Sequence, residues 1–504
     1  MNSTPLPVLS ATDVLGGETP RNVLLMLLPY WSPVVPPAGL CRIKSYLESR
    51  GHRARVVDFN SKKESLSFYY GYHAILEKYI PGGKRGNLKN LGNDLMEYHI
   101  MAYVLKGEDE PRYEEHIRGV VHSIFQVAAR TRMIEELDAE IRTFLAALGE
   151  YLEFLLEAAE PHVVGLTLYK TTLPLSIYTL RHIKALDPRI VTAVGGGIFV
   201  DTLNQEAPPF PGFLEQTRDC IDKVVIGDGE RAMELILAGR VPDDQRVINA
   251  RSLPGTPEKL WPVPDFSDFN VFKYSHLVAT GSTGCPFECS FCNELNFYGR
   301  FARRDAELVH QEMSSMSRAN HNRRLFFMTD SLLNPGVDEL CSSMILRDSP
   351  YYMDTYFRAS KQAARPEKCL FWRKGGLYRV RMGLESGSQR MLDLMDKKLT
   401  LQGDPGVAQG SLGGGHQDDD LLDRRPSRRG GGRLPPDARA DPRDEGPHLA
   451  GRVQPLPILP PGQQPRRRVG IEVGTGLPQG ARAPLLLFAL PGRPAPTPTW
   501  STSG

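Results

Sequence analysis

The chain has 504 residues, with 61 Lys and Arg against 59 Asp and Glu and a formal net charge of +2. This balance argues against a strongly basic nucleic-acid-binding surface. Residues 1–20 show no basic stretch followed by an apolar core, and no apolar run approaches the ~18 residues that a spanning helix needs. We therefore expect a cytoplasmic protein of two or three domains, with neither nucleic acid nor membrane as a partner.

The first domain is predicted to be α/β. Residues 1–20 are polar and punctuated by Gly and Pro, which predicts a disordered leader. The apolar run 22–28 is typical of a strand buried on both faces of a parallel sheet. A helical period over 39–50 ends at Gly51, and a strand is expected at 55–58. Together these elements predict a βαβ unit of a doubly wound fold.

Residues 61 to about 155 interrupt this pattern with helical stretches, which predicts a helical insertion. The βαβ pattern then resumes, and the domain is expected to span residues 21–245. Its further strands are predicted at 162–168, 190–194 and 223–226, with a helix at 175–186.

Small and polar residues follow these later strands. Ligands of open α/β sheets lie beyond the carboxyl ends of strands, and glycine lets a flat ligand approach the backbone. By itself the Gly195 triplet is a weak signal, because many such loops are only tight turns. No G-x-G-x-x-G opens a helix after the first strand, so a nicotinamide-binding site is excluded.

Residues 246–275 contain four prolines and predict an extended linker. The second domain is then expected to open with a strand at 277–280. Within 276–400, further strands are predicted at 324–331, 356–360 and 378–388, with a helix at 389–398. The result would be a partial (β/α) barrel of four units.

Three cysteines follow the first strand of this second domain at the spacing C-x3-C-x2-C: Cys285, Cys289 and Cys292. Thiolates are soft ligands that favour iron–sulfur clusters, zinc or copper(I). Three of them can hold three corners of a cubane, whereas a structural zinc site normally has four protein ligands. A disulfide framework is unexpected, because the chain is long and has seven cysteines.

The triplet, with Phe291 just before its third cysteine, resembles the signature of the radical S-adenosylmethionine (radical SAM) enzymes. The resemblance implies that Cys285, Cys289 and Cys292 hold a 4Fe-4S cluster. It implies that S-adenosylmethionine binds the open iron and is cleaved reductively to a 5′-deoxyadenosyl radical. It also implies an electron donor such as flavodoxin or ferredoxin.

The same resemblance assigns residues at the ends of the later barrel strands to S-adenosylmethionine binding. Those carried over, with Phe291, are Asp330, Ser331, Arg358, Glu385 and Ser386. For Asp330 and Ser331, a helix cap is an equally good interpretation from the residues alone.

The first domain resembles the cobalamin-binding domain that precedes the barrel in one large subgroup of the family. The matching pieces include the Pro36-Pro37-x-Gly39-Leu40 turn and the glycine-ended strands. The resemblance implies that cobalamin contacts Thr167, Gly195, Gly196, Gly227, Gly229 and Glu230. The D-x-H-x-x-G motif is absent, since Phe59-Asn60-Ser61 follows Asp58, which implies cobalamin without a histidine ligand from the protein.

From about residue 401 to 504, Gly, Pro and Arg predominate, lysine and tyrosine are absent, and no helical or strand period persists. This composition predicts a disordered tail and is also typical of a reading-frame change near residue 400. The family's barrel normally has six units, so two would be missing.

The expected function is therefore radical SAM chemistry, with cobalamin-dependent methylation or a related modification of an unactivated carbon in a small molecule or peptide. Two alternatives remain open at this point. One is a truncated, inactive remnant of such an enzyme, and the other is a zinc-binding module without enzymatic activity.

Overall fold

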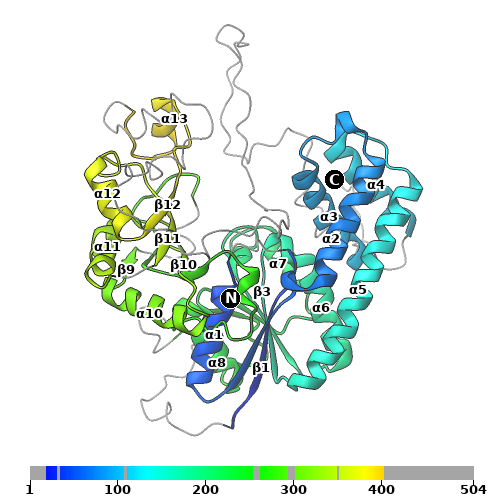
Figure 1. The fold of residues 1–504 in the computed structure, drawn as a ribbon. Coiled ribbons are helices and arrows are strands. Elements are labelled where there is room, and N and C mark those ends of the chain that lie inside the picture. Colours follow the sequence, from blue (N-terminus) through cyan, green and yellow to red (C-terminus); the bar gives the residue numbers. More distant parts are fainter. Residues whose placement is uncertain are drawn as a thin grey trace, which may run out of the picture. The chain divides into compact units, whose positions relative to one another are not determined.

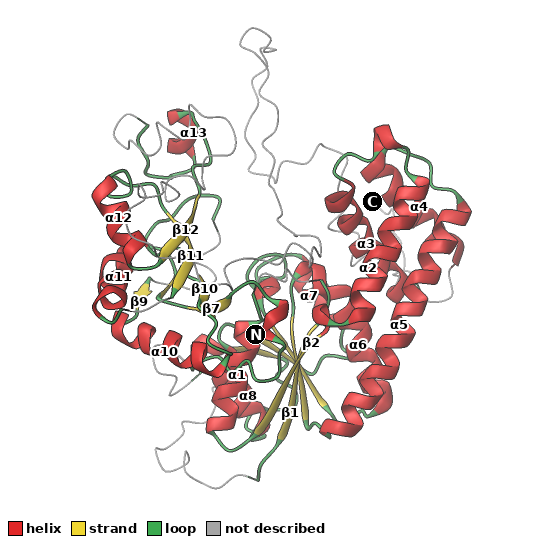
Figure 2. Cartoon of the chain, viewed as in Figure 1, coloured by secondary structure: helices red, strands yellow, loops and turns green. Residues whose placement is uncertain are grey.

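The computed structural model describes residues 19–30, 35–106, 110–253, 262–292, 301–348 and 351–401. The predicted leader and tail lie almost entirely outside these residues. The described part of the chain contains two parallel sheets and their helices (Figures 1 and 2). The predicted α/β class is confirmed.

The first sheet has six parallel strands in the order β2-β1-β3-β4-β5-β6. The strands are β1 (Asn22–Leu27), β2 (Arg53–Asp58), β3 (Val163–Thr167), β4 (Val191–Gly195), β5 (Lys223–Ile226) and β6 (Val247–Asn249). This order reverses direction between β1 and β3, as in flavodoxin-like doubly wound sheets.

Helices cover both faces of this sheet (Figure 1). On one face lie α1 (Ala38–Ser49) and α8 (Gly229–Leu237), and on the other lie α5 (Thr131–Ala159), α6 (Leu173–Leu186) and α7 (Pro209–Gln216). Both faces of β1 are buried, and Leu24 and Leu27 have no exposed surface. Burial on both faces explains why β1 is a continuous apolar run rather than an alternating pattern.

The predicted helical insertion is observed as four helices between β2 and β3. They are α2 (Lys63–Tyr79), α3 (Leu88–Leu105), α4 (Glu110–Phe125) and α5. Helix α5 has 29 residues and buries Ile134, Leu137 and Ile141 on one side, at the spacing of an amphipathic helix.

The second sheet has four parallel strands in the order β12-β11-β10-β7. Its strands are β7 (Leu277–Ala279), β10 (Leu325–Met328), β11 (Tyr352–Phe357) and β12 (Leu377–Met382). Between and after them come α10 (Ala306–Ala319), α11 (Val337–Leu346), α12 (Pro366–Lys374) and α13 (Gln389–Leu394), and a short hairpin pairs β8 (Ser282–Thr283) with β9 (Ala302–Arg303). Each strand lies beside its predecessor, which is the winding of a (β/α) barrel.

Two predicted boundaries in the second domain need correction. The third barrel strand is β11, which begins four residues before the predicted start at 356. A buried acid, Asp354, interrupts the apolar pattern there and hid the strand. The helix predicted at 389–398 ends at Leu394.

The predicted linker is also different from an extended tether. It contains β6, the sixth strand of the first sheet, which a three-residue run made difficult to detect. Farther along, Phe266 is buried in the core of the second sheet, and Asp265 and Asp268 form ion pairs with Lys44 of α1. Packing and ion pairing, rather than proline stiffness, determine the path of this segment.

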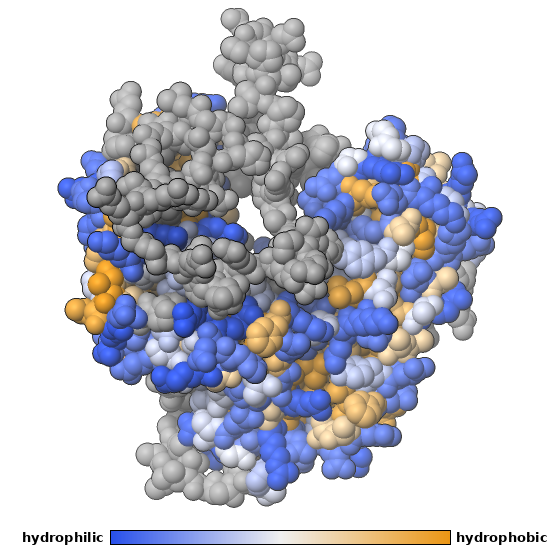
Figure 3. Space-filling model, in the orientation of Figure 1, coloured by the Kyte–Doolittle hydropathy of each residue, from blue (hydrophilic) through white to orange (hydrophobic). Residues whose placement is uncertain are grey.

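On the face shown in Figure 3, hydrophilic side chains predominate and are interrupted by separate hydrophobic groups. Of the helices in the described ranges, none is both long and apolar enough to cross a membrane.

Candidate functional site

The cysteine loop begins directly after β7 and β8, at the carboxyl end of the second sheet's first strand. A buried acid after the neighbouring strand β10 binds the residues that lead into this loop. The Asp330 carboxylate accepts a hydrogen bond from the Gly281 amide at 2.9 Å and another from the Ser282 hydroxyl at 2.6 Å. Burial raises the pKa of Asp330 to about 6.

Asp330 was predicted either to bind S-adenosylmethionine or to cap a helix. The N-cap of α11 is Gly336, so the capping interpretation is wrong. The observed bonds give Asp330 a positioning role, because they fix the residues that lead into the cysteine loop. Ser331 lies next to it and is half-buried.

The fourth βα unit contacts the other end of the cysteine loop. The Ser290 amide donates to the Met395 carbonyl at 2.9 Å. The Lys397 ammonium lies 5.3 Å from the centre of the Phe291 ring and 3.0 Å from the Glu385 carboxylate. Two predicted residues far apart in sequence, Phe291 and Glu385, are thus brought to the same lysine.

The third unit contributes Arg358, whose guanidinium lies 3.7 Å from the centre of the Phe287 ring in the cysteine loop. Its Nη2 atom is buried and has no hydrogen-bond partner in the described part of the chain. A buried cationic donor without a partner fits an anionic group beside the loop. Ser386 bonds locally, since its hydroxyl accepts from the Ser388 amide at 3.1 Å.

The three cysteine thiols are free; Cys285 and Cys289 are half-buried and Cys292 is exposed. Burial raises the pKa of Cys285, and the charges of Cys292 and Cys289 raise it further, while Arg358 lowers it.

The donor set therefore fits a thiophilic iron–sulfur cluster in its chemistry. In the ranges that the structure describes, no three His, Cys, Asp or Glu side chains are already arranged as a metal-holding group. The predicted ligand geometry stays a prediction.

The first sheet presents its predicted cofactor residues at one edge, the carboxyl ends of β3, β4 and β5. Thr167 and Gly195 are partners in the register of β3 and β4. Gly196 has a φ of +109°, and an added Cβ would lie 2.7 Å from the Leu168 carbonyl oxygen. Glycine at 196 is therefore required by the turn itself, before any ligand is considered.

Gly227, Gly229 and Glu230 lie at the end of β5 and the start of α8. Gly227 has a φ of +102°. An added Cβ on Gly229 would lie 2.7 Å from Cδ1 of Ile43 in α1, so this glycine permits close helix packing. Burial, together with the charge of Asp228, raises the pKa of Glu230 to about 7. The cobalamin assignment of these residues stays a prediction.

The sequence gives no indication of what the helical insertion does. In the structure, two of its helices contact the loops that follow β1 and β3, where the strand order reverses direction. Tyr30, after β1, stacks on Phe68 of α2 with ring centroids 6.4 Å apart. Lys170, after β3, lies 3.7 Å from the Glu97 carboxylate of α3. The insertion thus forms part of the carboxyl edge where ligands of such sheets bind.

Residues of α1 that carry no motif connect the first sheet to the second. Arg42 donates to the Thr280 hydroxyl at 2.5 Å, and Thr280 bonds Thr329 at 2.6 Å. Lys44 is almost fully buried and lies 2.8 Å from the Asp268 carboxylate. Residues so far apart in the chain carry no sequence signal that they meet.

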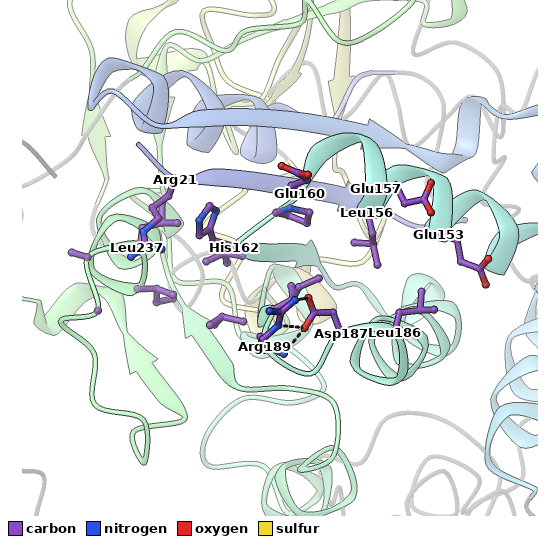
Figure 4. A pocket seen from close by; sticks show the side chains of 17 residues that line it. Arg21, Glu153, Leu156, Glu157, Glu160, His162, Leu186, Asp187, Arg189 and Leu237 are labelled. Carbon is purple, nitrogen blue, oxygen red and sulfur yellow. Dashed lines mark hydrogen bonds and ion pairs between the residues drawn. The ribbon is translucent and has the colours of Figure 1, made fainter. Parts of the chain in front are cut away.

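A cavity of 960 Å³ lies elsewhere, at the amino ends of the first sheet's strands (Figure 4). Its lining includes His162, Arg21 and the Asp187–Arg189 ion pair. Ligands of open α/β sheets bind at the opposite edge, so volume alone does not make this cavity the candidate site.

The fold and the cysteine loop define an α/β protein with a doubly wound sheet, followed by barrel-type βα units that present three free thiols after the first strand. No protein-family model matches the chain. Curated relatives do match it in sequence. Anaerobic magnesium-protoporphyrin IX monomethyl ester cyclase of Rubrivivax gelatinosus is 27% identical over 273 residues, which are 48% of this chain and 47% of the relative.

The cyclase of the same name from Cereibacter sphaeroides is 22% identical, over 51% of this chain and 46% of its own. An uncharacterised methyltransferase of Pyrococcus horikoshii is 26% identical, over 53% of this chain and 61% of its own. The chain thus spans about half the length of the curated cyclases. The resemblance to radical SAM enzymes that the cysteine motif predicts is confirmed.

Solved structures also resemble the chain. The cobalamin-dependent S-adenosylmethionine radical enzyme OxsB with aqua-cobalamin bound gives a TM-score of 0.46 at 14% identity, covering 76% of this chain and 46% of that one. The radical S-adenosylmethionine methyltransferase TsrM from Kitasatospora setae gives 0.45 at 16% identity, covering 76% and 62%.

Proposed function

We propose that the protein is a radical SAM enzyme that uses cobalamin to modify an unactivated carbon, with methyl transfer as the reaction. The observation that carries the proposal is the thiol triplet at the carboxyl end of β7, with Arg358 and Lys397 beside it. The names of the curated relatives, cyclases and a methyltransferase, support enzymatic activity. Among the similar solved structures, OxsB has aqua-cobalamin bound, and a structure of TsrM has cobalamin and a [4Fe-4S] cluster bound.

In this proposal Cys285, Cys289 and Cys292 hold a 4Fe-4S cluster, which supplies the electron for reductive cleavage of S-adenosylmethionine when bound. The chain's own residues orient the reactants. Arg358 offers its unpartnered nitrogen to a carboxylate, such as that of S-adenosylmethionine.

Asp330 holds the start of the cysteine loop, and the Ser290–Met395 hydrogen bond holds its end. Glu385, fixed by Lys397, is a polar contact for the same cosubstrate. The substrate is a small molecule or a peptide, and the electron donor is a flavodoxin or a ferredoxin.

The carboxyl edge of the first sheet is the proposed cobalamin site, with Thr167, Gly195 and Gly227 at its strand ends. Asp58 stands where a D-x-H-x-x-G motif would begin. Its carboxylate accepts from the Asn60 amide at 2.8 Å and from the Tyr274 hydroxyl, so it is already engaged within the protein. We infer that no histidine from this loop binds cobalt.

The cluster is tested by anaerobic reconstitution with iron and sulfide. We expect about four irons per chain and a visible iron–sulfur chromophore. Cys289→Ala should lose both, whereas Cys369→Ala, a half-buried thiol outside the motif, should keep them. Stoichiometric zinc without an iron chromophore would instead support the zinc-binding module.

The cobalamin site is tested by titration of the full chain with hydroxocobalamin. Retained cobalt and a spectrum without a protein nitrogen ligand are expected, and Gly196→Ala should weaken retention because it displaces the β3–β4 loops. No retained cobalt in the unaltered chain would contradict the proposal.

A second candidate is a remnant that holds the cofactors without turnover. It is favoured by the four strands of the second sheet, in which β12 pairs with β11 alone in the described part of the chain. S-adenosylmethionine cleavage by the reconstituted, reduced chain separates the two: 5′-deoxyadenosine formation supports the enzyme, and a full cluster without cleavage supports the remnant.

A further inference from the structure

One face of the second sheet carries charges and aromatic rings instead of a core. Helices α10, α11 and α12 cover the other face. The strand side chains on that face, such as Phe326, Met353 and Val380, are buried in the apolar core. Side chains alternate between the two faces of a strand. The opposite, inner face therefore includes Phe327, Asp354, Tyr356, Arg379 and Arg381.

Strand register places these inner residues side by side. Phe327 is the partner of Asp354, and Asp354 is the partner of Arg379. Tyr356 is the partner of Arg381 in the next pair along the same face. A register shift at Met353/Asp354 gives Asp354 both arginines as neighbours on one face.

Asp354 is fully buried and binds both arginines. Its Oδ2 atom accepts from Nε of Arg379 at 3.0 Å and from Nη2 of Arg381 at 2.7 Å, and its Oδ1 atom accepts from Nε of Arg381 at 3.0 Å. The two arginine side chains are each 37% exposed. Asp354 thus fixes both guanidinium groups, while part of each arginine side chain stays accessible to solvent.

The charges of this cluster do not cancel. Two guanidinium groups face one carboxylate, which leaves one positive charge. His276, 3.9 Å from Asp354, does not change this sum at neutral pH, because burial lowers its pKa to about 4. In the described ranges Nη1 of each arginine has no hydrogen-bond partner, so both can donate to a further anion.

Aromatic rings stand beside the free donors. Tyr356 is 47% exposed, unusually open for a large side chain on a sheet. The Phe327 ring meets it edge-on with centroids 5.9 Å apart, and the Arg381 guanidinium lies 5.4 Å from the centre of the Phe327 ring. Such rings offer a flat apolar surface next to the charge.

We propose that Arg379 and Arg381 bind a carboxylate of the substrate, whose flat unsaturated portion packs on Tyr356 and Phe327. A single surplus positive charge matches a monoanion, and paired guanidinium donors match the geometry of a carboxylate. The inference rests on the proposed function, because it assigns this inner face to the substrate of the reaction started at the cysteine loop.

The test measures binding of three fluorescent probes to the full chain by fluorescence anisotropy: 1-pyrenebutyrate, the neutral 1-pyrenebutanol and the cationic 1-pyrenebutylamine. The three share a ring system and differ in charge. We expect the carboxylate to bind about ten-fold more tightly than the alcohol, and the amine more weakly than the alcohol. Equal affinities for the three probes would overturn the inference, and this arm needs no variant.

Variants then locate the site. Arg381→Met should remove the carboxylate preference, Arg381→Lys should keep part of it, and Tyr356→Leu should weaken all three probes alike. Arg189→Met is the matched control, because Arg189 also pairs with an aspartate, Asp187, but lies on the first sheet's connections. A preference that survives Arg381→Met in a folded chain would overturn the assignment.

A last arm separates the substrate from the cosubstrate in the reconstituted chain. Displacement of 1-pyrenebutyrate by S-adenosylmethionine would assign the arginines to the cosubstrate and overturn the inference, whereas simultaneous binding supports it. Failure of the proposed function shows as absent iron and leaves the probe affinities unchanged. Failure of this inference shows as equal affinities in a chain that holds iron.

Discussion

The two parallel sheets of this protein differ in what lies against their faces. The six-stranded sheet has helices on both faces, and its strand β1 buries apolar side chains in both directions (Figure 1). The four-stranded sheet has helices on one face, while its other face carries Asp354, Arg379 and Arg381. The first sheet is stabilised by apolar burial on two sides, whereas the second combines apolar burial with a fixed charge cluster that a ligand can use.

Buried acids at the carboxyl ends of the strands also differ between the two sheets in what they contact. Asp330 in the second sheet accepts hydrogen bonds from Gly281 and Ser282. Glu230 in the first sheet has a raised pKa and lies near the charge of Asp228. Burial raises the pKa of both acids, but Asp330 also positions a loop through its two hydrogen bonds.

The largest loss of stability is expected when the charge cluster of the second sheet is broken. Arg379→Met combined with Arg381→Met leaves Asp354 buried without a cation, which should lower the free energy of unfolding by about 3–5 kcal/mol. Adding Asp354→Asn to the pair should recover most of this loss, because it removes the unpaired charge. Urea unfolding of the double and triple variants measures both, and equal stabilities would contradict the prediction.

The second largest loss of stability is expected at the carboxyl edge of the first sheet, where a substitution would strain the backbone. Gly196→Ala should lower the free energy of unfolding by about 2–3 kcal/mol, because φ is +109° and the new Cβ would meet the Leu168 backbone. Gly39→Ala is the control: it lies in α1 with nothing within 4 Å of an added Cβ, and should be neutral or stabilising. Thermal unfolding of both variants makes the comparison.

A pH-dependent effect of about 2 kcal/mol is expected at Glu230. Its pKa is about 7 in the folded protein and 4.5 in the unfolded chain, so its contribution to stability is present below pH 4.5 and is lost as pH rises through 7. Glu230→Gln should therefore stabilise the protein at pH 8 and change little at pH 5.

Glu234 of the same helix is the matched control for this experiment. Its carboxylate accepts from the Tyr46 hydroxyl at 2.6 Å, and hydrogen bonds from Tyr46 and Arg231 lower its pKa despite burial. Glu234→Gln should destabilise the protein at pH 8. Urea unfolding at both pH values tests the pair, and a stabilising Glu234→Gln would contradict the reasoning.

The smallest effect concerns the tail, which lies outside the described residues. From composition, removal of residues 402–504 should leave the unfolding midpoint and the reconstituted iron content unchanged. A clear fall in either would show that the tail contributes to the fold or the site, and would contradict the sequence prediction.

Much of the fold was predictable because local patterns agree with the tertiary structure. The apolar run of β1 and the helical period of α1 were each located within one or two residues. Failures occurred where long-range partners compensate a locally unfavourable residue. Asp354 hid the start of β11, since its neutralising arginines are 25 and 27 residues away.

Sequence alone determined the α/β class, the resemblance to radical SAM proteins and the position of the thiol triplet, because these depend on residue type and spacing within short windows. Tertiary structure alone decided that Arg358, Lys397 and Asp330 surround the cysteine loop, and that α1 connects the two sheets. It also gathered Arg379, Arg381 and Tyr356 on one face, because strand register brings together residues that no local pattern relates.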